Sequence, residues 1–157
     1  MAVAVFLDTS VLLAGLVDFG PQSAPAQKLL HAVSEGTVKA PGTAWHCCLE
    51  FFSVATRLPP EFRVTSADAV RLLEEEVFAR MSVHDLPGSG RLPLLRTAVQ
   101  DAMAGGRIYD AHIADVARAA GARVVVTDNR RHFLSALRHG MRVETPTEFL
   151  AALRKGG

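Results

Sequence analysis

Two apolar runs in the chain each stop at an aspartate. Residues 3–7 are continuously apolar with a bias towards β-branched side chains, and Asp8 follows them directly. Residues 123–127 have three consecutive valines at their centre, and Asp128 follows them. Short, continuous, β-branched apolar runs are typical of strands that are buried on both faces. The pattern therefore predicts two buried strands, each followed by a carboxylate.

Helical patterns alternate with shorter strand patterns in the rest of the chain. We expect a helix after Asp8 and further helices at residues 26–34, 43–57, 65–76, 92–103, 108–120, 134–138 and 147–155. Shorter strands are expected at residues 38–40, 77–83 and 141–143. Pro41-Gly42 would end the first of these strands, Thr43 would cap the helix that follows, and Thr65 with Asp68 has the form of a capping box. The alternation predicts an α/β three-layer sandwich, with a short central parallel sheet and helices on both faces.

Length and composition indicate the number of domains and the cellular compartment, but they do not indicate a function. The length of 157 residues suits a single domain over residues 1–157, and no apolar run reaches the roughly 18 residues of a membrane span. The first residues have no positive n-region of a signal peptide, and Cys47 and Cys48 are adjacent, unlike the cysteines of metal fingers. We therefore expect a cytoplasmic protein without a membrane partner. The net charge of +1 neither indicates nor excludes nucleic-acid binding.

Four acidic residues occupy positions that suit a shared metal site. Asp8 and Asp128 follow strands whose carboxyl ends meet at one edge of a parallel sheet, where ligands bind in such folds. Glu50 is the only acidic residue of an otherwise apolar helix, and Asp110 stands near the start of another. Carboxylates that lie close together raise each other's pKa unless a cation is present. Mg²⁺ or Mn²⁺, which take oxygen ligands, would supply that charge.

Each of these acids also has an ordinary explanation. Asp8 can be a helix cap, and Asp128-Asn129 is a common turn pair. Glu50 can point to solvent from an amphipathic helix, and Asp110 can interact with the helix dipole. Only the order of the four along the chain favours a joint role.

Asp115 is a weaker candidate for the same site. It follows Asp110 by five residues, which places it about 140° further round a helix at about 100° per residue. The two carboxylates therefore do not share a face, and we expect Asp115 to be solvated. Surface or supporting positions, rather than metal ligation, are also expected for three histidines: His46, His112 and His132.

The chain resembles the PIN-domain ribonucleases, and within them the VapC-type toxins of bacterial toxin–antitoxin pairs. The matching stretches are FLDTSVLLA, the helix with Glu50 followed by Phe51-Phe52, IYDAHIADVARAAGA and VVVTDNRRHF. The last two are the most specific, because they come in the family's order. The resemblance extends over nearly the whole chain but is weak between residues 59 and 90.

This resemblance implies a metal-dependent endoribonuclease. Asp8, Glu50, Asp110 and Asp128 correspond to the acidic catalytic residues of the family, which bind Mg²⁺ or Mn²⁺. Asp8 and Asp110 are expected to be direct ligands, whereas Glu50 and Asp128 bind directly or through water. The implied reaction is hydrolysis of an RNA phosphodiester to a 5′-phosphate and a 3′-hydroxyl. Two residues are expected to orient the carboxylates: Ser10 and Thr127.

The resemblance also implies partners. Arg107, Arg130 and Arg131 are candidates to contact RNA phosphates, although a solvated loop explains them equally well. A cognate antitoxin is expected to cover the active-site groove, and a homodimer is common in the family. Apolar residues of the first helices could line that groove, although each is more often a core residue: Leu13, Leu16, Phe19, Phe51 and Phe52.

Two other functions remain open at this point. A phosphatase or phosphotransfer domain would use Asp8 as a nucleophile, but it expects a second aspartate where Ser10 stands. A PIN-like module could instead bind RNA or a partner without cleaving, and the presence of all four acids argues against it.

Overall fold

A five-stranded parallel sheet forms the centre of the computed structural model, which describes residues 2–156. The strands lie in the order β3-β2-β1-β4-β5, and every neighbouring pair is parallel. Their bounds are β1 Val5–Leu7, β2 Pro41–Ala44, β3 Ser82–His84, β4 Val124–Val126 and β5 Arg142–Glu144. The predicted α/β class is confirmed, and the two strands expected to be buried, β1 and β4, are neighbours at the middle of the sheet.

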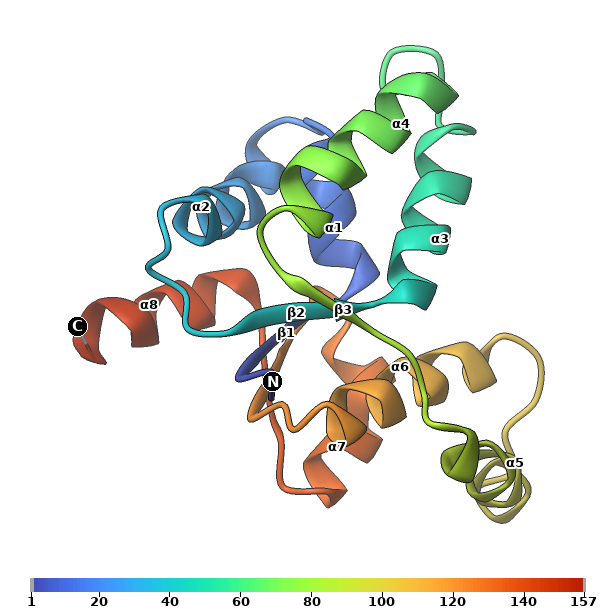
Figure 1. The fold of residues 1–157 in the computed structure, drawn as a ribbon. Coiled ribbons are helices and arrows are strands. Elements are labelled where there is room, and N and C mark those ends of the chain that lie inside the picture. Colours follow the sequence, from blue (N-terminus) through green and yellow to red (C-terminus); the bar gives the residue numbers. More distant parts are fainter. Residues whose placement is uncertain (1, 157) are drawn as a thin grey trace.

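Helices cover both faces of this sheet (Figure 1). They are α1 Thr9–Leu16, α2 Ala24–Ser34, α3 Trp45–Ala55, α4 Ser66–Leu72, α5 Arg91–Gln100, α6 Arg107–Ala119, α7 Leu134–Arg138 and α8 Pro146–Gly156. In Figure 1, α1 to α4 lie above the sheet and α5 to α7 lie below it, whereas α8 lies beside α2. The three-layer arrangement expected from the alternating pattern is therefore present. No helix within residues 2–156 is long and apolar enough to cross a membrane.

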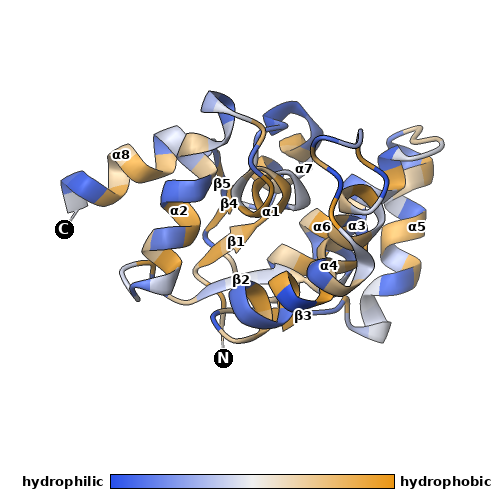
Figure 2. Ribbon diagram, turned by 90° about the horizontal axis from the view of Figure 1, so that it is seen from above, coloured by the Kyte–Doolittle hydropathy of each residue, from blue (hydrophilic) through white to orange (hydrophobic). Residues whose placement is uncertain are grey.

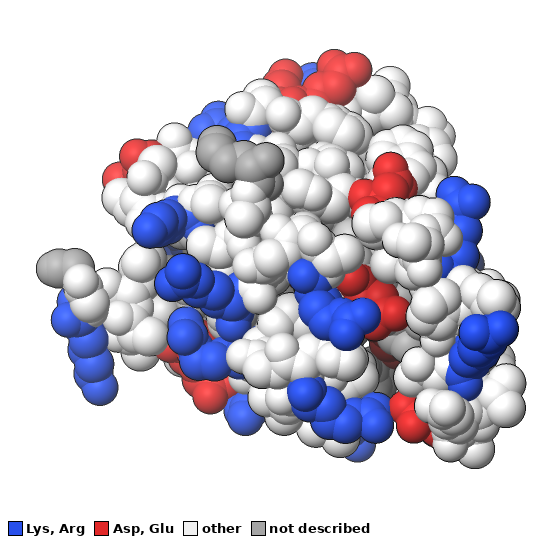
Figure 3. All heavy atoms as spheres, turned by 60° about the horizontal axis from the view of Figure 1, so that its bottom comes forward, with Lys and Arg blue, Asp and Glu red and all other residues white. Residues whose placement is uncertain are grey.

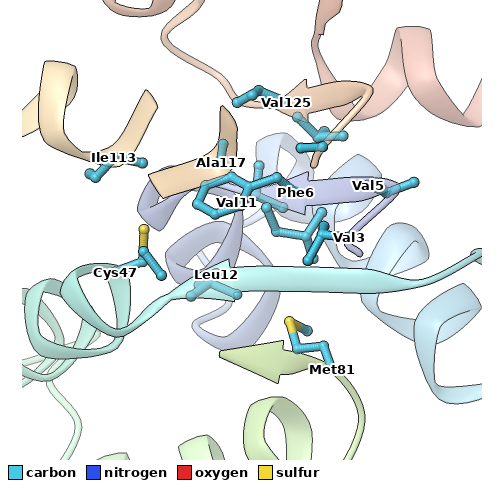
Figure 4. Close-up of a cluster of buried hydrophobic side chains, with 14 of the residues drawn as sticks. Val3, Val5, Phe6, Val11, Leu12, Cys47, Met81, Ile113, Ala117 and Val125 are labelled. Atoms are coloured by element: carbon cyan, nitrogen blue, oxygen red, sulfur yellow. The ribbon is translucent and has the colours of Figure 1, made fainter. Parts of the chain in front are cut away.

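The core consists of the middle strands and the helix faces turned towards them. Phe6 and Leu7 of β1 are completely buried, and so are Leu12 of α1 and Val125 of β4. Figure 4 shows how these strands and α6 enclose one apolar cluster, with Ile113 and Ala117 at its side. Figure 2 shows β1 and β4 as hydrophobic throughout, whereas α2 and α8 alternate between hydrophobic and hydrophilic residues. Burying this apolar surface stabilises the middle of the sheet, which in turn holds the strand ends in place.

The second strand corrects the sequence analysis. We expected a strand at residues 38–40 that ended at Pro41-Gly42, with Thr43 as a helix cap, but β2 comprises Pro41–Ala44. Proline is tolerated at the first position of a strand. Gly42 allows β2 to approach β1, because a Cβ at Gly42 would lie 2.5 Å from the side chain of Val3. Thr43 is fully buried within the strand.

The segment before β3 also differs in part. The capping box is confirmed, since the backbone N–H of Asp68 donates to Oγ1 of Thr65 at 3.1 Å. The helix then continues as a π-helical turn over Leu73–Phe78, so the strand expected at residues 77–83 is shorter and begins at Ser82. Val77 is completely buried as part of that turn, which explains why its apolar character resembled a strand.

Candidate metal centre

Asp8 lies at the carboxyl end of β1 and is almost fully buried, with 4% of its surface exposed. The hydroxyls of Ser10 and Thr127 both donate to its Oδ2, at 2.9 and 2.8 Å. Asp8 occupies the N-cap position of α1, but its side chain makes no capping hydrogen bond to that helix. The two residues expected to orient a carboxylate thus contact Asp8.

The charge of Asp8 has no cationic partner within residues 2–156. No Lys, Arg or His side chain in that part of the chain forms an ion pair with it. Burial raises the pKa of Asp8, and the hydrogen bonds from Thr127 and Ser10 only oppose this rise. A buried carboxylate without a counter-charge is costly. The position is therefore suited to a bound cation.

Glu50 is held near this position by Thr9. The hydroxyl of Thr9 donates to Oε1 of Glu50 at 2.9 Å, which joins the start of α1 to α3. Nε2 of His46, one turn earlier on α3, lies 3.6 Å from the same oxygen. Thr9 was not among the residues predicted to support the site. Its position directly after Asp8 was the one available signal for its contact with a second acid.

Asp110 and Asp128 lie at the more open part of the same edge. Asp110 belongs to the first turn of α6, and Nδ1 of His132 lies 3.5 Å from its Oδ2. Its pKa is raised by burial and by the charge of Glu50, against the lowering effect of His132. Asp128 follows β4 with much of its surface exposed, and its backbone N–H donates to Oγ of Ser10 at 3.1 Å. The protein around its carboxyl group removes part of its hydration, which raises its pKa.

These acids surround one edge of the sheet without forming a closed coordination shell. Within residues 2–156, no three His, Cys, Asp or Glu side chains converge closely enough to hold a metal ion as they stand. The donors are nevertheless carboxylate oxygens, which Mg²⁺ and Mn²⁺ prefer. The donor chemistry therefore fits a hard divalent cation, and the four carboxylates would have to approach one another to share one ion.

Two histidines link the helices that carry Glu50 and Asp110. Nδ1 of His46 on α3 lies 2.8 Å from Nδ1 of His112 on α6, so one ring donates to the other. Burial and the neighbouring His46 lower the pKa of His112. Tyr109 packs edge-on against His46. His46 and His112 thus connect α3 and α6, the helices that carry Glu50 and Asp110. The sequence did not predict this contact.

The three candidate arginines do not share one environment. Arg107 and Arg131 line a cavity of about 660 Å³ together with Asp110. Arg130 instead forms an ion pair with Glu148 of α8, at 3.0 Å. On the face that Figure 3 shows, acidic side chains lie in a hollow bordered by basic side chains. Two of the three arginines are thus placed where a polyanion near Asp110 would meet them.

Asp115 lies apart from the four acids. Burial raises the pKa of Asp115, against the lowering effect of Arg118, His139 and His112. Asp115 was expected to be solvated but is partly buried, because the face of α6 that carries it packs against the protein.

The apolar residues considered for a partner groove belong to the core or pack against it, which is the more common position for such residues. Phe51 has no exposed surface and belongs to the core, so it cannot line a groove. Leu13, Leu16, Phe19 and Phe52 are partly buried against the core. The exposed apolar side chains of this region lie instead on α3, on α4 and on the turn that follows: Trp45, Leu49, Val70 and Phe78.

Comparisons with known proteins agree with this architecture. A model of the PIN domain family matches residues 4–131. The chain is 36% identical to Ribonuclease VapC27 of Mycobacterium tuberculosis over 85 residues, which are 54% of this chain and 60% of that protein. The matched region thus spans less than two thirds of this curated relative.

Solved structures with low sequence identity share the fold. PAE2754 from Pyrobaculum aerophilum superposes with a TM-score of 0.64 and 22% identity, covering 99% of this chain and 98% of that one. VapC20 of Mycobacterium tuberculosis, described as a sarcin–ricin loop cleaving toxin, superposes with a TM-score of 0.60 and 16% identity. The superposition covers 78% of this chain and 87% of that one. FitAB bound to an IR36 DNA fragment superposes with a TM-score of 0.60 and 14% identity, covering 90% of this chain and 94% of that one.

Proposed function

Because the chain belongs to the PIN domain family, we propose that it is a divalent-cation-dependent endoribonuclease, and that it acts as the toxin of a toxin–antitoxin pair. The observation that carries the proposal is the state of Asp8, a buried carboxylate held by two hydroxyls without a cationic partner among the described residues. Glu50, Asp110 and Asp128 lie at the same edge. The name of the relative, Ribonuclease VapC27, supports RNA as the substrate.

The four carboxylates would hold Mg²⁺ or Mn²⁺, with Asp8 and Asp110 as direct ligands. When bound, such an ion lowers the pKa of an attacking water and stabilises charge on the scissile phosphate. Ser10 and Thr127 fix the orientation of the Asp8 carboxylate, and Thr9 does the same for Glu50. Groups that orient ligands in this way tune a metal site without touching the ion. Arg107 and Arg131 are placed to bind the RNA backbone beside Asp110.

Partners belong to the same proposal. An antitoxin protein would cover the site, and the exposed apolar side chains of Trp45, Leu49, Val70 and Phe78 supply a surface that favours such a partner. We further propose that residues 1–157 fold as one domain, that the protein works in the cytoplasm, and that it forms a homodimer.

RNA cleavage in the presence of Mg²⁺ or Mn²⁺ tests the proposal. The protein should cleave RNA with either cation and lose this activity in EDTA, and Asp8→Asn should abolish it. Asp18→Asn is the matched control, because Asp18 is exposed and its hydrogen bond from Gly20 can be kept by asparagine. Equal cleavage by Asp8→Asn and the unchanged protein would contradict a role for the metal-binding acids.

The alternative is a PIN-like module that binds RNA or a partner without cleaving. That function would be favoured if neither the protein nor Asp8→Asn cleaved RNA while both still bound it. The products distinguish the proposed reaction further, since hydrolysis at the expected bond leaves a 5′-phosphate and a 3′-hydroxyl.

A further inference from the structure

A large cavity adjoins Asp110 on the side of α7. It lies between the first turn of α6, the 3₁₀ turn Arg130–Phe133 and α7, and its volume of about 660 Å³ lies within the range typical of small-molecule sites. Asp110 and His132 form part of its wall. The cavity is therefore continuous with the candidate metal centre.

The charges that face this cavity are mainly positive. Arg138 is neutralised by Asp101, whose Oδ2 accepts a 2.8 Å hydrogen bond from it. Arg107 and Arg131 form no ion pair with any residue in the described part of the chain, 2–156. Two guanidinium groups thus remain available at the wall of a cavity that begins at Asp110.

Most of the rest of the wall is apolar, with Ser135 as the polar exception. Met103 and Ala111 line it, together with Leu134, which is 60% exposed at the start of α7. A nucleotide has the same division between a charged phosphate and a base with a large apolar face. The combination of two free guanidinium groups and an apolar wall favours this ligand over a simple anion.

We propose that this cavity binds one unpaired nucleotide of the RNA, next to the bond that is cut. Arg107 and Arg131 contact its phosphates, while Met103 and Leu134 contact its base. A base that is stacked and paired within an RNA helix cannot enter such a cavity. The inference rests on the proposed ribonuclease function, and it adds which side chains of this chain hold the nucleotide beside the scissile bond.

Paired leucines of α7 test the apolar wall. Leu134 lines the cavity, whereas Leu137 is 51% exposed on the same helix and does not line it. Leu134→Glu should weaken the binding of a labelled single-stranded oligoribonucleotide about tenfold, because it adds a negative charge beside the bound phosphates. Leu137→Glu should change binding little. Binding is measured with Mg²⁺ in an Asp8→Asn background, which keeps the RNA intact.

Paired arginines test the charged wall. Arg107→Ala and Arg131→Ala should each weaken binding and make the salt dependence shallower by about 0.7 in logarithmic slope, the value for one phosphate contact on a single strand. Arg123→Ala is the control, because Arg123 is exposed at the opposite end of β4. A fully paired duplex of the same sequence should bind more weakly than the single strand.

Cleavage by single variants gives a second measurement that does not depend on Asp8→Asn. Leu134→Glu and Arg131→Ala should raise KM with a smaller change in kcat. The proposal is overturned if Leu134→Glu binds the oligoribonucleotide as tightly as Leu137→Glu does. It is also overturned if Arg107→Ala and Arg131→Ala bind it as tightly as Arg123→Ala, or if the protein does not bind single-stranded RNA. A larger effect of Tyr109→Ala than of Leu134→Glu would place the nucleotide on the other side of α6 instead.

These outcomes are separate from the outcome for the proposed function. Cleavage that is unaffected by Leu134→Glu would overturn the nucleotide cavity and leave the ribonuclease standing. The expected binding pattern without cleavage would retain the cavity and favour the non-cleaving module.

Discussion

The hydroxyl of Thr127 donates a 2.8 Å hydrogen bond to Oδ2 of Asp8, although 119 positions separate the two residues in the sequence. The parallel register of β1 and β4 produces this contact, because Leu7 is paired with Val126 and the next residue of each strand lies beside its neighbour. The Thr127 hydroxyl also accepts the backbone N–H of Asn129 at 2.9 Å. One threonine therefore joins the buried acid to the loop that carries Asp128.

Removing this hydroxyl should affect both stability and metal binding. Thr127→Val keeps the shape of the side chain but leaves Asp8 with one donor fewer and the Asn129 N–H without its acceptor. We expect a loss of about 1–3 kcal/mol in the free energy of unfolding, because a buried polar group becomes unsatisfied. Mn²⁺ affinity should fall about 10–100-fold, as for other groups that orient metal ligands.

Denaturant unfolding and calorimetric titration with Mn²⁺ measure these two effects. Thr127→Ser is the control, because it keeps the hydroxyl and should remain close to the unchanged protein. Metal affinity that is unaltered in Thr127→Val would show that the orientation of Asp8 does not depend on this contact.

Neutralising Asp8 should stabilise the metal-free protein. Burial raises the pKa of Asp8 above its ordinary value of 3.8, so the folded state binds its proton more tightly than the unfolded state. The stability contributed by this group is present below pH 3.8 and is lost as pH rises through the raised pKa. At neutral pH, Asp8→Asn removes the cost of keeping this buried carboxyl group charged. Asparagine can still accept both hydroxyl hydrogen bonds.

Thermal unfolding at several pH values measures the effect. In EDTA at neutral pH, Asp8→Asn should have the higher Tm, and the difference should shrink as pH falls. Mg²⁺ should raise the Tm of the unchanged protein but not that of Asp8→Asn, because a ligand stabilises only the state that binds it. A lower Tm of Asp8→Asn in EDTA would mean that another group already compensates this carboxylate.

The sequence predicted those parts of the fold that depend on local pattern. Continuous apolar runs identified β1 and β4, and the parallel sheet then placed Asp8 and Asp128 at one edge. The identity of β2 was missed because Pro41 and Gly42 break strands in most settings. Here pairing with β1 and β3 overrides that tendency, and a small residue is needed where two strands approach closely.

Contacts between helices could not be predicted in the same way. Thr9 and Glu50 are 41 positions apart, and His46 and His112 are 66 positions apart. Their meeting depends on how α1, α3 and α6 pack, which no local pattern encodes. The acids of the candidate site and the two hydroxyls that contact Asp8 could therefore be named from the sequence, whereas the contacts of Thr9 and of the histidine pair were found only in the structure.

Thr9 should control the position of Glu50. Thr9→Val keeps the buried shape but removes the hydroxyl that donates to Oε1 of Glu50 at 2.9 Å. We expect the rate of RNA cleavage to fall about 10–100-fold, as it does when other groups that orient metal ligands are removed. RNA binding should change little. Cleavage rates under single-turnover conditions measure this, and Thr9→Ser should restore most of the activity. Cleavage by Thr9→Val at the unchanged rate would show that Glu50 is positioned by other contacts.

The pairing of His112 with His46 should make part of the stability sensitive to acid. Burial and His46 lower the pKa of His112 below its ordinary value of 6.5, so the unfolded state binds this proton more tightly. The contribution of His112 is present above pH 6.5 and is lost as pH falls through the lowered pKa. This sign is opposite to that of Asp8. An NMR titration should give His112 a pKa below 6.5, and a value at or above 6.5 would contradict the buried contact.

Arg130 and Arg131 are adjacent but should differ in their effect on RNA. Nη1 of Arg130 lies 3.0 Å from Oε1 of Glu148, which also accepts the backbone N–H of Thr145 at the start of α8. Arg131 lines the cavity beside Asp110 instead. Arg130→Ala should therefore leave RNA binding and KM nearly unchanged, and an exposed ion pair of this kind contributes little to stability. Arg131→Ala should weaken binding and raise KM.

Binding isotherms of the two variants at matched salt concentrations decide between these expectations. Equal losses in Arg130→Ala and Arg131→Ala would mean that the ion pair with Glu148 opens when RNA binds. In that case Glu148→Gln, which releases Arg130 without removing its charge, should bind RNA more tightly than the unchanged protein. If Arg130 serves only to connect the 3₁₀ turn to α8, Glu148→Gln should leave RNA affinity unchanged, because the guanidinium it frees lies outside the cavity that Arg131 lines.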